Sequence, residues 1–62
     1  MQAPRSLGII GHGDFGRFLE MLARRFAPGV ALRVYARKAA PDGQRFFTLE
    51  ETCQCDVVII SV

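Results

Sequence analysis

The chain has 62 residues, half of them hydrophobic and 23% charged, with a formal net charge of +2 at pH 7. This length allows one small folding unit, and the balance of apolar and charged residues argues against disorder. Basic residues occur in short pairs, not in a block of one sign, so nucleic-acid binding through a basic stripe is disfavoured. No apolar run approaches the roughly 20 residues of a membrane span. No secretory signal begins the chain, so we expect a cytoplasmic protein without a membrane partner.

The first residues, 1–6, are polar and predict a flexible leader, so the folding unit is expected over residues 7–62. Residues 7–10 form a continuous apolar run bounded by glycine, which predicts a buried strand of a parallel sheet.

A helix is expected from Asp14 to about residue 27, because apolar residues then recur at spacings of three and four. The spacing assigns the apolar residues to its core side, namely Phe15, Phe18, Leu19, Leu22, Ala23 and Phe26. It places the charged residues on the opposite side, namely Arg17, Glu20, Arg24 and Arg25. Pro28 follows, and Gly29 is expected to end the helix in a left-handed conformation.

The second half of the chain predicts more strands and one short helix. Residues 30–37, "VALRVYAR", are typical of a strand centred on Val34. A turn at residues 41–43 leads to "RFFT", which we expect to be a stunted third strand, because the seven-residue connection over 38–44 is too short for a normal parallel crossover. Thr48 stands three residues before Glu51, the spacing of a capping box, and therefore predicts a brief helix.

Residues 57–62 predict a final buried strand, which would need cover on both faces. The order of these elements is typical of an α/β protein with a parallel sheet and helical crossovers. We therefore expect the first half of a Rossmann-type sheet, as a segment of a larger α/β protein. Cys53 and Cys55 are one residue apart and suit neither a disulfide nor a zinc site, so reduced thiols and no metal are expected.

The most informative stretch is the G-x-G-x-x-G pattern formed by Gly11, Gly13 and Gly16, between the first strand and the helix. In this pattern the first glycine permits a tight turn, the second leaves room for a diphosphate, and the third lets the helix approach the sheet. The helix N-terminus also favours an anion. We therefore predict binding of NADP or NAD, with a glycine-rich turn that holds no ligand as the alternative.

The remaining residues of this loop have simpler expected roles. His12 is expected to lie near the dinucleotide or in solvent, not to transfer a proton, and Asp14 is expected to be the helix N-cap.

The end of the second predicted strand favours NADP over NAD. Domains that prefer NAD carry an acidic residue about 20 residues after the glycines, where it binds the ribose 2′-hydroxyl. Here the residue at that distance from Gly16 is Ala36, which is not acidic, and Arg37 and Lys38 follow it. These cations suit a 2′-phosphate, although a solvated Arg–Lys pair on a loop is the alternative.

Together, "LGIIGHGDFGRFLEMLARRF", "VYAR" and "GQRFFTLEETCQCDVVIISV" resemble the N-terminal segment of the prephenate/arogenate dehydrogenases of tyrosine biosynthesis. The resemblance implies a Rossmann domain followed by a helical C-terminal domain that forms a homodimer and holds the substrate. It also implies oxidative decarboxylation of a cyclohexadienyl acid with hydride transfer to NAD(P). The glycines would contact the diphosphate, Arg37 the ribose phosphate, and Ser61–Val62 would begin the turn beside the cofactor. The family's catalytic residues would lie beyond this chain.

The candidate cofactor-binding residues are Gly11, His12, Gly13, Asp14, Phe15, Gly16, Arg37, Lys38, Ser61 and Val62. No catalytic residue is assigned, and the chain alone is not expected to be active. Two other interpretations remain open. The same glycine motif occurs in NAD(P)-dependent enzymes of the β-hydroxyacid and proline-forming types, so the protein could belong to one of these. It could also be a non-catalytic module that senses a nucleotide, because such a module would carry the motif too.

Overall fold

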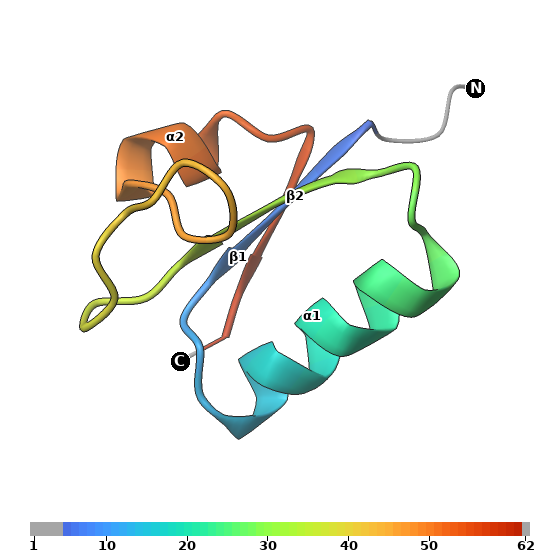
Figure 1. Cartoon of the computed structure of the whole chain (residues 1–62), viewed down its shortest axis with the longest axis horizontal. Coiled ribbons are helices and arrows are strands. Elements are labelled where there is room, and N and C mark those ends of the chain that lie inside the picture. The colour runs from blue at the N-terminus through green and yellow to red at the C-terminus, as the bar shows by residue number, and fades with distance from the viewer. Residues whose placement is uncertain (1–4, 62) are drawn as a thin grey trace.

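The computed structural model of the chain describes residues 5–61. Its three strands are β1 (Ser6–Ile10), β2 (Ala31–Tyr35) and β3 (Val57–Ile60), and they form one parallel sheet in the order β2-β1-β3 (Figure 1). The central strand is β1, where Ile9 pairs with Val34 on one side and with Ile59 on the other. The expected α/β architecture, a partial Rossmann-type sheet, is confirmed.

Two helices cover the sheet from opposite sides, α1 (Asp14–Phe26) and α2 (Leu49–Cys53) (Figure 1). Parallel crossovers are almost always right-handed. From β1 the chain crosses to β2 at one edge of the sheet, and from β2 it crosses back to β3 at the opposite edge. Two right-handed crossovers in opposite directions along the sheet place their helices on opposite faces. The strand order therefore reverses beside β1, and in open α/β sheets ligands bind in the crevice at such a reversal.

The sheet begins earlier than the sequence predicted. Ser6 belongs to β1, and its hydroxyl accepts a hydrogen bond from the Asp56 N–H (2.8 Å). The Arg5 N–H donates to the Asp56 carboxylate (2.8 Å). Residues 5 and 6 are thus tied to the start of β3, which corrects the expected leader at these two positions; its residues 1–4 lie outside the described part of the chain.

The expected third strand is reduced to a single parallel bridge between Val34 and Phe46. The Phe47 N–H donates to the Val34 carbonyl (2.8 Å), and the Val34 N–H donates to the Arg45 carbonyl (3.1 Å). Residues 45–47 thus lie beside β2 but form only one bridge with it. This agrees with the stunted strand expected from the short connection over residues 38–44.

The sheet-facing side of α1 agrees only in part with the one predicted by its apolar spacing, because Leu19, Leu22 and Ala23 are half-buried but the three phenylalanines are not. Phe15, Phe18 and Phe26 are 61%, 50% and 72% exposed, whereas Gly16 and Glu20 are the buried residues of the helix. The assignment of the phenylalanines to the core and of Glu20 to the outer face was therefore wrong. The physical reason is the close approach at Gly16, which turns that side of α1 toward the sheet.

Both ends of α1 also differ in detail. Gly13 is the N-cap and no side chain among the described residues caps the helix, so Asp14 is its first residue and not the predicted cap. At the other end the Ala27 N–H donates to the Ala23 carbonyl (2.9 Å). Gly29 has no positive φ, so the predicted left-handed glycine is wrong.

The core centres on Ile9 and Val34, both fully buried, with Thr52 of α2 also fully buried. The expected burial of the last strand is wrong within the described residues, because Val57 and Ile60 are 40% and 68% exposed. No helix in residues 5–61 has the length and apolar character needed to cross a membrane.

The capping box predicted at the start of α2 is confirmed, and it makes a testable contribution to stability. The Thr48 hydroxyl accepts from the Glu51 N–H (3.1 Å), while the Glu51 carboxylate accepts from the Thr48 N–H (3.0 Å). We expect Thr48→Ala to lower the free energy of unfolding by about 1 kcal/mol in denaturant titrations. Thr48→Ser keeps the cap and should be nearly neutral; equal stability of the Ala and Ser variants would contradict this role.

Candidate functional site

The carboxyl ends of the three strands meet at the turn from β1 to α1. The Gly11 N–H donates to the Tyr35 carbonyl at the end of β2 (2.8 Å). The Ser61 N–H, just after β3, donates to the Ile10 carbonyl at the end of β1 (2.7 Å). The turn is therefore fixed from both neighbouring strands.

Two glycines of the turn are required by the fold itself. Gly11 has φ of +101°, which L side chains rarely adopt, and a Cβ atom there would collide with the Ser61 carbonyl oxygen. A Cβ atom on Gly16 would collide with the Gly11 carbonyl oxygen. These close contacts within the protein are enough to explain why glycine occupies the first and third positions of the motif, with no need for a ligand.

Gly13 has no such explanation. Its φ of −80° is open to any residue, and a Cβ atom placed on it would have no neighbour within 4 Å. The side chain is absent at a point where the chain has room for one. Gly13 is also the N-cap of α1, and no side chain of residues 5–61 accepts from the first N–H groups of the helix.

Beside this turn lies a groove of about 630 Å³. Its nitrogen-bearing lining residues are His12, Arg17, Lys38 and Arg45, and its other lining residues are Ala36, Ala39 and Phe46. None of the described residues that line it is acidic. The groove therefore combines apolar and basic lining, an arrangement that attracts an anion.

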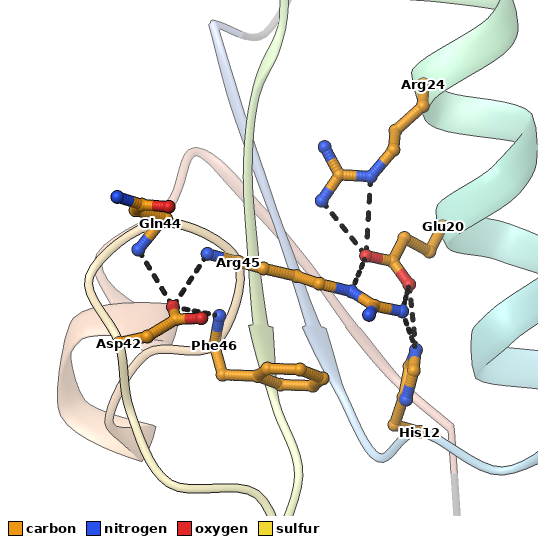
Figure 2. Close-up of polar contacts among 7 residues, drawn as sticks. All are labelled: His12, Glu20, Arg24, Asp42, Gln44, Arg45 and Phe46. Atoms are coloured by element: carbon orange, nitrogen blue, oxygen red, sulfur yellow. Dashed lines mark hydrogen bonds and ion pairs between the residues drawn. The ribbon is translucent and has the colours of Figure 1, made fainter.

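A buried carboxylate, Glu20, organises the basic residues around the groove (Figure 2). Its Oε1 and Oε2 accept from Nη2 and Nε of Arg45, both at 2.8 Å. Arg24 of the same helix donates to Oε2 (3.0 Å), and His12 Nε2 lies 2.8 Å from Oε1. The Glu20 side chain is only 6% exposed, so these three side chains, and not water, are the main partners of its carboxylate.

These partners set the protonation of the cluster. The hydrogen bond from Arg45 is the main cause that lowers the pKa of Glu20 to about 2, against the opposing effect of burial. The carboxylate is therefore ionised at neutral pH and can only accept hydrogen bonds. His12 Nε2 lies 2.8 Å from this carboxylate, and the two form a hydrogen bond when Nε2 carries the hydrogen.

The segment that carries Arg45 is fixed by its own turn (Figure 2). One oxygen of Asp42 accepts from the N–H groups of Gln44 (2.9 Å), Arg45 (2.9 Å) and Phe46 (3.0 Å). These donors hold the pKa of the Asp42 carboxyl below its ordinary value. The Arg45 guanidinium also lies over the Phe46 ring, 4.8 Å from its centre.

The structure brings together most of the residues that the sequence singled out. Gly11, His12, Gly13, Asp14, Phe15 and Gly16 form the turn and the start of α1, and Ser61 packs against Gly11. Lys38 lines the groove, whereas Arg37 is exposed and is not among its lining residues. Val62 lies outside the described residues.

Sequence reasoning missed Glu20 and Arg45. One signal for Glu20 was available, because it follows the helix-packing Gly16 by one turn and so shares its face. Arg45 carried no comparable signal, since its position depends on how residues 42–46 fold against β2.

Comparisons with protein-family models, with curated proteins and with solved structures found no match to this chain. Within residues 5–61 no group of three or more His, Cys, Asp or Glu side chains could hold a metal ion. Function is therefore inferred from the geometry of the turn and the groove.

The Glu20 cluster predicts a specific dependence of stability on pH. Because the folded-state pKa of Glu20 is lowered from 4.5 to about 2, its contribution is present above pH 4.5 and is lost as the pH falls toward 2. We expect Glu20→Gln to lower the free energy of unfolding by about 3 kcal/mol at pH 7, with the difference from wild type shrinking between pH 4.5 and 2. Denaturant titrations across this pH range measure it.

The matched control is Glu50→Gln, an exposed carboxylate on α2, which should leave stability nearly unchanged. A Glu20→Gln difference that stays constant from pH 7 to pH 2 would contradict the assignment of the ionised form to Glu20.

Proposed function

We propose that this chain binds the diphosphate of a nicotinamide dinucleotide at the turn Gly11–Gly16, as the cofactor-binding segment of an NAD(P)-dependent oxidoreductase. The main support for this proposal is the absence of a side chain at Gly13. Its missing side chain serves no contact within the described chain, whereas a diphosphate lying against the backbone would require the space.

Three further features support an anion at this point. The first N–H groups of α1 have no side-chain cap from the part of the chain that the structure describes, and the positive end of the helix dipole lies beside them. The turn stands where the strand order reverses, next to β1 and β3. The adjoining groove is lined by basic side chains.

We further propose a preference for NADP over NAD. The position after β2 is Ala36, followed by Arg37 and Lys38, so no carboxylate is available there for the ribose hydroxyl groups. The groove beside it carries Lys38, which can neutralise a phosphate on the ribose.

The reaction is proposed from the resemblance to prephenate/arogenate dehydrogenases. The bound dinucleotide would supply a hydride acceptor for the oxidative decarboxylation of a cyclohexadienyl acid in the cytoplasm. Residues 5–61 are assigned only cofactor contacts. The substrate-binding and dimer-forming domain that the resemblance implies would supply the catalytic groups.

The proposal predicts that Gly13 is needed for binding but not for folding. Asparagine is a good N-cap, so Gly13→Asn should keep or raise the melting temperature. Its side chain would occupy the space above the turn, and we expect the Kd for NADPH to rise about 10-fold or more, roughly the effect of one lost charged contact. Fluorescence of the reduced nicotinamide measures binding.

The matched control for this variant is Gly29→Asn, because a Cβ atom on Gly29 would also have no neighbour within 4 Å, but Gly29 lies beyond the far end of α1. It should leave the Kd for NADPH within about twofold of wild type, since it touches no phosphate contact. If the Gly13→Asn variant and wild type bind NADPH with equal affinity, the diphosphate does not bind at this turn and the proposal is wrong.

If NADP is preferred, the two basic residues after β2, Arg37 and Lys38, should contribute unequally to the affinity for NADPH. Lys38 lines the groove and Arg37 does not, so Lys38→Gln should raise the Kd for NADPH about fivefold to tenfold, and Arg37→Gln by less. The Kd for NADH should change little in both variants. A larger loss in Arg37→Gln would show that the phosphate lies on the outer side of this loop.

A further inference from the structure

We propose that Arg45, from the segment between β2 and α2, is the residue that selects dinucleotides with a phosphate on the adenosine ribose. This inference rests on the proposed dinucleotide site and deepens it. Arg45 was not among the residues that the sequence pattern suggested for the cofactor.

Arg45 shares the groove with the other basic residues near the end of β2. It lines the same space as Lys38 and Arg17. Its side chain is 48% exposed, so part of the guanidinium is held by the protein and part is open to solvent. Three cationic side chains thus face one space in which the described residues provide no carboxylate.

The hydrogen bonds of Arg45 leave donors available. Glu20 takes Nε and one hydrogen of Nη2, Nη2 also lies 3.4 Å from His12 Nε2, and the Phe46 ring covers one face of the guanidinium. Nη1 has no hydrogen-bond partner among residues 5–61. A guanidinium has five N–H donors, so the two hydrogens of Nη1 can donate to phosphate oxygens.

The guanidinium is also fixed before any ligand arrives. Glu20 holds it in two-pronged geometry, and the turn at Asp42 fixes its backbone. A side chain that is already ordered loses less conformational entropy on binding. The single charge of Glu20 is shared between Arg24 and Arg45, so a net positive charge remains at the groove.

The competing explanation is that Arg45 only fastens residues 42–46 to α1. Arg24 distinguishes the two roles, because it donates to the same Glu20 oxygen but does not line the groove. A purely structural ion pair would make the two arginines similar in their effect on ligand preference.

The test compares Arg45→Gln with Arg24→Gln by measuring the Kd for NADPH and for NADH. We expect Arg45→Gln to weaken NADPH binding about 10- to 50-fold with the Kd for NADH within about twofold, as for loss of a charged hydrogen bond. Arg24→Gln should leave both constants within about twofold, and Arg45→Lys should recover part of the NADPH affinity because it keeps the charge.

Equal weakening of both ligands by Arg45→Gln, or the same result for Arg24→Gln, would overturn the role of Arg45 and leave dinucleotide binding intact. Wild-type protein that binds neither ligand would overturn both proposals. If Arg45→Gln does not fold, the Arg45 Nε–H resonance of wild-type protein decides: it should shift with NADPH and not with NADH, and equal shifts would overturn the proposal.

Discussion

The close approach of α1 to the ends of the strands is the constraint on which the rest of this structure depends. Gly16 lies against the Gly11 carbonyl, and Gly11 lies against Ser61, with no space for a side chain at either glycine. This contact brings the N-terminus of α1 to the point where the strand order reverses. It also turns the helix so that Glu20, one turn later, is buried and the phenylalanines are exposed.

The burial of Glu20 has a second consequence. An ionised carboxylate in this position requires partners, and it finds them in His12 from the turn, Arg24 from its own helix and Arg45 from the segment after β2. The cluster therefore joins α1 to residues 42–46, a segment that has only one bridge to the described sheet. The same carboxylate that stabilises the fold also holds a cation at the groove, so stability and the proposed ligand preference share one set of contacts.

The elements that follow from local rules could be predicted from the sequence. The glycine turn, the order of strands and helices and the Thr48–Glu51 capping box depend on residues close together in the chain. The structure contains all three, except that the expected third strand is a single bridge. The sheet-facing side of α1 could be read only in part from its apolar spacing, because the tight packing at Gly16 buries Glu20 and leaves the phenylalanines exposed. Arg45 is held partly by the local turn at Asp42 and partly by long-range contacts with Glu20 and Val34, and the sequence carries no signal for the long-range contacts.

The central claim is that a dinucleotide diphosphate rests against the bare backbone at Gly13 and the first N–H groups of α1. The most direct measurement is an NMR titration of ¹⁵N-labelled protein with NADPH. The amide resonances of Gly13, Asp14 and Phe15 are predicted to shift most and to saturate at one ligand per chain. If these resonances stay unchanged, or if the largest shifts fall on α2, the account is contradicted.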